Sequence, residues 1–316
     1  MSTFKSKRVL IVDGMNNFLR CVNSFDDTGH SGDPVGGVLG TLYTIGKAVR
    51  VMGCDRVIIV YDGVNNTKQR RKMLPDYKGK RRVQRDMDRL DNPNKEVNRK
   101  AQLKLLIQCF NNLPVLQFIH KGVEADDVIA YAAQQLVHTH DASEAIIMSS
   151  DKDFLQLVSN KIKVWSPSKN KLYGVDEVIE DFEVHPENMI WYRAFVGDKS
   201  DEIKGVPGIG HKSAKNIENI GNKPLSLTEI QNYATKRKEA RWKNFLEIHQ
   251  KKFSENVELM QLDISIIPSK ILLNISERLH KFAPISSRPG LLRLVGDNGI
   301  PLKLTWIDKF IKSTSN

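Results

Sequence analysis

The stretch RVLIVDG at residues 8–14 gives the main indication of the fold, because four apolar residues in a row stand directly before an aspartate and a glycine. The same pattern returns as RVIIVYDG at residues 56–63. Short apolar runs that are rich in β-branched residues are typical of buried strands. By this criterion we predict four strands, at residues 8–12, 56–61, 115–118 and 145–149.

Helical patterns separate the predicted strands, at Val38–Val51, Glu96–Phe110 and Val123–Leu136. Strands that alternate with helices imply an α/β fold with a mainly parallel sheet. After about residue 186 helix-like segments dominate, and the basic residues 236–252 read as one helix. We therefore expect an α/β domain at residues 1–185 and a helical domain at residues 186–316.

The chain is basic, with 48 lysine and arginine residues against 37 acids and a formal net charge of +11. Such a charge favours a polyanionic partner, because binding releases counterions from phosphates. The alternative is a generally basic surface that aids solubility.

The three cysteines are widely spaced and match neither a disulfide framework nor a metal site, which indicates a reducing compartment. The N-terminus is too short and polar for a signal peptide, and no apolar run reaches the roughly 18 residues of a membrane span. We expect a cytoplasmic protein that binds no membrane, with a monomer as the default state.

Nine acidic residues at five places in the chain look aimed at one point. In parallel sheets the ligand site lies beyond the carboxyl ends of the strands, where several of these acids stand. Carboxylates gathered there repel, by about 4 kcal/mol for two charges 4 Å apart, and a divalent cation removes that penalty. Oxygen ligands without His or Cys favour Mg²⁺ or Mn²⁺ over Zn²⁺. The nine are Asp13, Asp62, Glu124, Asp126, Asp127, Asp151, Asp153, Asp198 and Asp201.

Each acidic motif also has an ordinary structural explanation. A strand-end aspartate often caps the next helix, and one or two acids at 124–127 would suit a helix N-terminus. Glu124 and Asp127 share a helix face while Asp126 points elsewhere, so at least one of the three is a cap or a supporting residue. Asp151 and Asp153 alternate in an extended stretch, which lets them hold one ion or bridge two. Two ions about 3.5–4 Å apart would suit hydrolysis of a phosphodiester.

Two further segments favour phosphate binding. Residues 64–100 are strongly polar and read as a mobile basic loop, whose most basic point is DYKGKRR at 76–82. The alternative for this stretch is a solvated charge run. GVPGIG at 205–210, followed by HKSAKNIEN, predicts a helix–hairpin–helix, in which glycines let the backbone approach a phosphate and the second helix offers N–H groups. The alternative there is an ordinary turn.

Taken in chain order, VDG, YDG, YKGKR, EADD, SDKD and GDKSDEIKGVPGIG resemble the flap endonuclease, or 5′-nuclease, family over about residues 8–220. The resemblance extends to the phage-type 5′–3′ exonucleases known as ribonuclease H and to the 5′-nuclease domain of bacterial DNA polymerase I. It implies a PIN-like core at 1–185 with a helical arch at about 64–112. It also implies a helix–three-turn–helix at about 197–220 within a helical DNA-binding region at 186–316.

The resemblance also implies roles for individual residues. Two Mg²⁺ ions, or Mn²⁺ in their place, would lie in two groups of acids: Asp13, Asp62, Asp126 and Asp151 for the first, and Asp153, Asp198 and Asp201 for the second, with Glu124 and Asp127 close by. Lys78 would contact the scissile phosphate and Arg81 would guide the 5′ strand, so both count as catalytic together with Asp13, Asp126 and Asp151. A K⁺ ion would bind the hairpin carbonyls and Ser213. The implied DNA-binding residues are Arg70, Arg71, Lys80, Arg82, Gly205, Gly208, Gly210, Lys212, Ser213 and Lys215.

The implied activity is metal-dependent cleavage near the junction of single strand and duplex. Its substrates would be 5′ flaps, nicked or gapped duplex and RNA primers on DNA during replication, in the host cytoplasm if the gene is carried by a phage. Partners could include a single-strand-binding protein or a sliding clamp. Three alternatives are a non-catalytic structure-specific DNA-binding protein, a PIN-type ribonuclease and a phosphatase with an aspartyl nucleophile. The complete set of acids, the hairpin and the many DNA-binding features disfavour these in turn.

Overall fold

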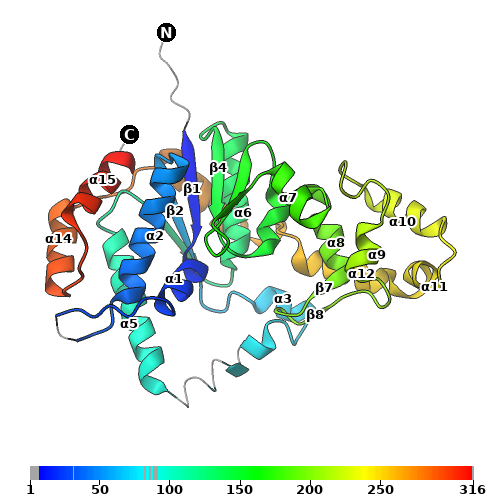
Figure 1. Cartoon of the computed structure of the whole chain (residues 1–316), viewed down its shortest axis with the longest axis horizontal. Helices are drawn as coiled ribbons and strands as arrows, with labels where there is room; N and C mark the ends of the chain where they lie inside the picture. The colour runs from blue at the N-terminus through cyan, green and yellow to red at the C-terminus, as the bar shows by residue number, and fades with distance from the viewer. Residues whose placement is uncertain (1–6, 31, 82, 85–86, 88–91, 315–316) are drawn as a thin grey trace, which may run out of the picture.

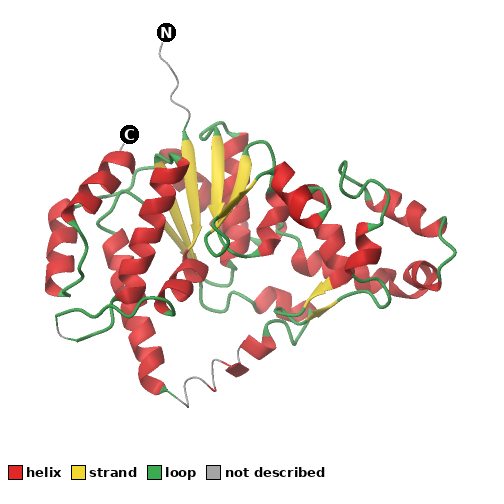
Figure 2. Cartoon of the chain, viewed as in Figure 1, coloured by secondary structure: helices red, strands yellow, loops and turns green. Residues whose placement is uncertain are grey.

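A six-stranded sheet forms the centre of the computed structural model, which describes residues 7–30, 32–81, 83–84, 87 and 92–314 (Figures 1 and 2). The strand order is β3-β2-β1-β4-β5-β6, and every pairing is parallel except that of β5 with β6. The strands are β1 (Arg8–Asp13), β2 (Arg56–Asp62), β3 (Leu116–His120), β4 (Glu144–Met148), β5 (Ile162–Ser166) and β6 (Lys171–Tyr173). The predicted mainly parallel α/β sheet is confirmed.

The strand order reverses direction next to β1, which pairs with β2 on one side and with β4 on the other. In open α/β sheets the crevice at such a reversal, beyond the carboxyl ends of the strands, is where ligands bind. Asp13 is the last residue of β1, and Ser149 follows β4 directly. The fold therefore directs the first and fourth acidic motifs to one crevice.

Two helical layers cover the sheet, because alternate strand residues point to opposite faces. Leu10 and Val12 face a core formed with α1 (Gly14–Val22), α2 (Gly36–Met52) and α5 (Pro93–Phe110). Val9 and Ile11 face the other core, which contains α6 (Ala125–His138). All four strand residues are fully buried, so the sheet is a rigid base for the side chains at its edge.

Beyond the sheet the chain is mainly helical and forms a lobe on the right of Figure 1. Its elements are α7 (Val175–Phe182), η2 (Pro186–Asn188), α8 (Met189–Val196), β7 (Gly197–Asp198), β8 (Ile203–Lys204), α9 (His211–Lys215), α10 (Leu227–Thr235), α11 (Ala240–Asn244), a π-helical turn η3 (Phe245–His249) and α12 (Gln250–Met260). The helix predicted at 236–252 is present, but it begins four residues later at Ala240, and the π turn joins α11 and α12 into one helical run that ends at Met260. The remaining elements are α3 (Lys68–Met73), η1 (Lys152–Leu157), η4 (Ile264–Ile266), α13 (Ser269–Lys281), α14 (Arg288–Asp297) and α15 (Leu304–Thr314).

The last three helices return to the sheet instead of staying with the lobe. Ile275 and Leu279 of α13 belong to the core around α6, while Leu291 of α14 and Ile307 of α15 belong to the core around α2 and α5. Both cores therefore cross the predicted boundary at residue 185. A sequence pattern shows that a helix has an apolar face, but it does not show which surface will bury that face.

Two expectations from composition can be compared with the structure. All three cysteines are free and buried. Among the residues that the structure describes, no helix combines the length and apolarity needed to cross a bilayer.

Candidate active site

Asp13 and Asp151 are joined through Ser149 at the reversal of the sheet. The Ser149 hydroxyl donates to Asp13 Oδ2 at 3.0 Å, and the Asp151 N–H donates to Ser149 Oγ at 3.1 Å. Asp13 also caps α1 by accepting the Asn16 N–H at 3.0 Å. Asp13 therefore both caps α1 and lies in the cluster of acids, so the two explanations that the sequence allows hold together.

Asp62 connects the end of β2 to the start of α6. Its Oδ1 accepts the Ala125 N–H at 3.0 Å and the Asn66 side-chain N–H at 2.7 Å. Asp126 follows Ala125 and occupies the first turn of α6. The third acidic motif is therefore held next to the second by a hydrogen bond from the helix backbone.

Charge repulsion shows that four of these acids share one neighbourhood. Burial raises the pKa of Asp13 to about 7, with Asp62 and Asp151 adding to the rise against the opposing Asn16 and Ser149 hydrogen bonds. Burial raises the pKa of Asp126 well above its ordinary value, and the charges of Asp13 and Asp151 add to it, while Lys78 opposes the rise. We call Asp13, Asp62, Asp126 and Asp151 the first acidic group.

Glu124 and Asp127 form ion pairs with Arg70, which corrects two predictions. Arg70 was expected on the DNA-binding surface, but it is only 4% exposed and donates to both oxygens of Asp127 at 2.8 Å. It also donates to Glu124 at 2.7 Å and, through Nε, to the Leu259 carbonyl of α12 at 2.9 Å. Because both oxygens of Asp127 accept hydrogen bonds from Arg70, Asp127 is a partner of this arginine and is not placed as a metal ligand.

Lys78 lies between the two groups of acids. Its Nζ is 3.4 Å from both Glu124 oxygens and 3.9 Å from Asp201 Oδ2. Burial alone would lower the pKa of Lys78, but Glu124 and the neighbouring acids raise it above its ordinary value, so the side chain stays charged. Its backbone is in the left-handed region, with φ of 53°. Lys78 is therefore held as a charged side chain beside Glu124 and Asp201.

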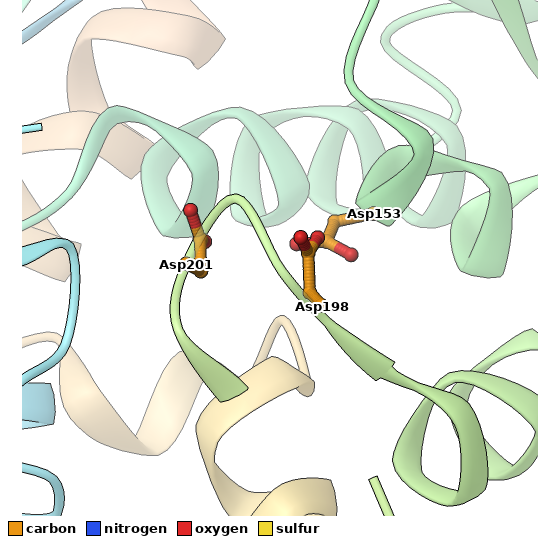
Figure 3. A group of neighbouring side chains, drawn as sticks. All are labelled: Asp153, Asp198 and Asp201. Atoms are coloured by element: carbon orange, nitrogen blue, oxygen red, sulfur yellow. The ribbon is translucent and has the colours of Figure 1, made fainter. Parts of the chain in front are cut away.

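The second acidic group consists of Asp153, Asp198 and Asp201, whose nearest oxygens all lie within 4.8 Å of one another. Figure 3 shows the carboxylates of Asp153 and Asp198 facing each other, with Asp201 further along the loop that follows β7. Burial raises the pKa of Asp153 to about 7 and also raises that of Asp201. Asp153 and Asp198 are half-buried and Asp201 is buried, and carboxylate oxygens at this spacing fit a divalent cation.

Arg193 of α8 neutralises part of the second acidic group. Its Nη2 lies 2.5 Å from Asp153 Oδ1 and 2.6 Å from Asp198 Oδ2. Burial would raise the pKa of Asp198, but the Ser200 hydrogen bonds and Arg193 hold it below the ordinary value. Sequence reasoning missed this residue, although a lone arginine in the apolar helix MIWYRAFV is itself a signal, because a buried charge needs a partner.

The basic segment before α5 has several distinct environments. Arg81 is about half exposed and reaches Asp201 at 2.7 Å and the Ser200 hydroxyl at 3.1 Å. Lys80 is exposed, and its backbone N–H donates to Glu202 at 2.7 Å. Arg71 donates to the Tyr77 carbonyl at 3.2 Å. Arg82, the fourth predicted basic residue here, lies outside the described residues.

The structure places α3 at 68–73 and a turn at 75–78 where the sequence predicted a mobile loop. Tyr77 was not singled out from the sequence, yet it is buried, and its hydroxyl lies 3.3 Å from Glu124 and 3.4 Å from Asp201. Tyr77 thus connects the basic segment with Glu124 and with Asp201 of the second acidic group.

The glycine hairpin presents a backbone surface to solvent. Val206 and Ile209 are buried, whereas Gly208 and Gly210 are exposed, and Gly208 has a φ of 80° that favours glycine. Gly205 has a different role from the one predicted, because a side chain there would collide with the carbonyls of Phe195 and Val196. Lys212 is exposed, and Lys215 is paired with Glu183 at 2.8 Å.

Ser213 does not fit the expected role of K⁺ ligand. Its hydroxyl accepts a hydrogen bond from Arg241 Nη1 at 2.8 Å. A guanidinium in contact with this oxygen would repel a monovalent cation bound to the same atom. Ser213 is therefore not available as a K⁺ ligand while Arg241 binds its hydroxyl.

Comparison with known proteins adds the family. The family model described as "5′-3′ exonuclease, N-terminal resolvase-like domain" matches residues 8–183. A curated 5′-3′ exonuclease of Aquifex aeolicus (strain VF5) is 33% identical over 213 residues, which are 67% of this chain and 68% of that protein. One from Buchnera aphidicola (subsp. Acyrthosiphon pisum) is 29% identical over 252 residues, 75% of this chain and 83% of the relative.

Solved structures show the same fold. The flap endonuclease of bacteriophage T5, in a pseudo-enzyme-product complex with DNA and metal ions, superposes with a TM-score of 0.72 at 22% identity. The superposition covers 87% of this chain and 99% of the phage protein. The similarity therefore includes both the sheet and the helical lobe.

Proposed function

Because the chain belongs to the 5′-3′ exonuclease family, we propose that it hydrolyses phosphodiester bonds near 5′ ends of DNA at the two acidic groups described above. The single observation that carries this proposal is the position of Lys78: its Nζ is 3.4 Å from Glu124 and 3.9 Å from Asp201 of the second group, and its charge acts on Asp126 of the first group. Oxygen donors on both sides of a fixed cation suit a phosphate that is bound between two metal ions.

The first acidic group would hold one Mg²⁺ through Asp13, Asp62, Asp126 and Asp151, and the second would hold another through Asp153, Asp198 and Asp201. When bound, these ions would supply an activated water and stabilise the leaving oxygen, and Mn²⁺ has the same preference for oxygen ligands. Lys78 would fix the scissile phosphate by charge. Arg81, which is half exposed beside Asp201, would orient the strand that enters. Burial, which raises the pKa of Asp13 and of Asp153 to about 7, makes their ionised forms costly, and a bound cation would offset that cost in both groups.

The substrates that suit this arrangement are 5′ flaps, nicked or gapped duplex, and RNA paired with DNA, as in the removal of primers during replication. The exposed glycine hairpin and Lys212 would hold the duplex by its backbone without reading bases. A single-strand-binding protein or a sliding clamp would be a natural partner for such a reaction.

A 5′-labelled flap on duplex DNA tests the proposal. Incubation with Mg²⁺ should release a short labelled fragment, and EDTA should prevent its release. Binding without any product, under Mg²⁺ and also under Mn²⁺, would instead favour a structure-specific DNA-binding protein and would contradict a nuclease function.

A further inference from the structure

The exposed face of the glycine hairpin is bordered by a residue far away in the sequence. A side-chain carbon added at Gly208 would lie 3.3 Å from Cβ of Arg241 and 4.0 Å from its Cα. The guanidinium of the same residue donates to the Ser213 hydroxyl at 2.8 Å, on the helix that follows the hairpin. Arg241 therefore lies beside Gly208 of the hairpin and binds Ser213 of the following helix α9, although 28 residues separate it from Ser213.

Packing of the next residue fixes Arg241 in this position. Trp242 is only 2% exposed, and its ring packs edge-to-face with Phe195 and Tyr233, with centroids 5.9 and 5.2 Å apart. The Phe195 carbonyl in turn accepts the Val206 N–H of the hairpin at 2.7 Å. Hairpin and α11 thus rest on one aromatic cluster, so Arg241 is held beside the hairpin by the core beneath it.

The guanidinium is suited to hold a phosphate at this place. It carries five N–H donors, and within the described part of the chain its one hydrogen bond is the one to Ser213. Arg241 is exposed, and so are Gly208 and Gly210 beside it. A guanidinium can bind phosphate through two parallel hydrogen bonds, which places charge and geometry together.

We propose that Arg241 is the built-in cation of the hairpin: it binds the same duplex phosphate as the glycine backbone and occupies the place that a K⁺ ion would otherwise take. The inference rests on the proposed function in that the ligand is duplex DNA. Its consequence is that the protein binds duplex equally well with or without K⁺, because the positive charge beside Ser213 is supplied by the chain itself.

The test compares duplex binding in KCl and in NaCl at equal ionic strength, with EDTA present so that no cleavage occurs. The dissociation constants of the wild-type protein for duplex in the two salts should differ by no more than about twofold. Arg241→Gln should bind about tenfold more weakly in NaCl, the scale of one lost charge-assisted phosphate contact. Lys238→Gln is the matched control, since it removes the same charge from an exposed position of the same basic segment, and it should cost no more than about twofold.

A double variant tests whether the arginine and K⁺ compete for one place. Without the guanidinium, the Ser213 oxygen becomes available, so Arg241→Gln should bind more tightly in KCl than in NaCl by about threefold. Adding Ser213→Ala should abolish that difference, because the side-chain ligand is gone. A lack of any K⁺ response in Arg241→Gln would overturn the replacement of K⁺ by arginine.

Other outcomes separate this inference from the proposed function. Wild-type protein that binds at least fivefold more tightly in KCl, or Arg241→Gln that binds as well as Lys238→Gln, would overturn the inference even if flaps are cleaved with Mg²⁺. Wild-type protein that binds duplex in the expected manner but never cleaves a flap would contradict the nuclease function alone. Arg241 is exposed, so thermal unfolding of its variant should match the wild type and exclude misfolding.

Discussion

The two acidic groups are held together in opposite ways. In the first group, hydrogen-bond donors without charge hold the carboxylates: Ser149 for Asp13, and the Ala125 N–H for Asp62. In the second group, cationic side chains do so: Arg193 bridges Asp153 and Asp198, and Arg81 pairs with Asp201. Neutral donors leave the charge of an ionised carboxylate without a counter-ion, which a metal ion would supply, whereas the arginines already neutralise part of the second group.

The two groups should therefore respond differently when a carboxylate is removed, when an arginine is removed and when the pH changes. We expect the first group to bind its ion more tightly, since among the described residues its four acids form no direct ion pair, and Lys78 acts on Asp126 only through its charge. The second group should exchange its ion for Arg193 more readily.

Asp151→Asn should have the largest effect. Removing one carboxylate from the group that lacks its own cations should lower the rate of flap cleavage about 10²- to 10³-fold, the scale for losing a preorganised electrostatic contact. Flap binding should be preserved or strengthened, because a negative charge near the phosphate has gone. Single-turnover cleavage and equilibrium binding measure the two effects. Asp176→Asn, on the exposed start of α7, is the control and should change neither. Equal loss of cleavage and binding in Asp151→Asn would contradict a metal-site role.

Two arginine variants compare a permanent counter-ion with an exchangeable one. Arg70→Gln and Arg193→Gln should each destabilise the metal-free protein by about 3 kcal/mol, because each leaves buried carboxylates without a partner. Urea unfolding in EDTA and in Mg²⁺ measures this. Mg²⁺ should restore most of the loss in Arg193→Gln, whose carboxylates belong to the second acidic group. It should restore little in Arg70→Gln, because Asp127 lies behind the site. Equal rescue of both variants would erase the distinction.

Lys78→Ala tests the cation that lies between the two groups. Loss of the charge should slow single-turnover cleavage about 10²-fold with a much smaller effect on flap binding, because the lysine acts on the scissile phosphate. Lys281→Ala is the control and should change neither, since its side chain is 67% exposed and its neighbour Phe282 contacts Arg56, at the opposite end of β2 from Asp62. An unchanged cleavage rate in Lys78→Ala would refute the assigned role.

Much of the first acidic group could be predicted from the sequence, because it depends on local patterns. The apolar runs before Asp13 and Asp62 identify strands, and the position after parallel strands directs those side chains to one edge. The strand β5 was missed, although its alternating pattern IKVWS is typical of a strand with one buried face.

The counter-ions could not be predicted in the same way. Arg70 stands in a run of basic residues, which reads as surface charge, and its burial depends on Glu124, Asp127 and a carbonyl of α12 almost 190 residues away. Arg241 likewise meets Ser213 only because Trp242 packs on Phe195. Such contacts arise from tertiary packing and leave no spacing pattern in one sequence.

The last and smallest expected effect is on stability against pH, where the two groups should behave alike. Burial raises the pKa of Asp13 and of Asp153 from 3.8 to about 7 in the folded, metal-free protein. The folded state therefore binds more protons than the unfolded state between these values, and stability falls as the pH rises through 7. Between pH 6 and pH 8 the ionisation of Asp13 and that of Asp153 should each lower the free energy of unfolding by about 1.4 kcal/mol. Urea unfolding in EDTA measures the fall, and Asp13→Asn or Asp153→Asn should each reduce it by the share of that residue. Saturating Mg²⁺ should abolish the fall, because the ion stabilises the ionised carboxylates that high pH favours. If Mg²⁺ abolished only the share that Asp153→Asn removes, the second group alone would hold the ion, and the expected tighter binding by the first group would be wrong.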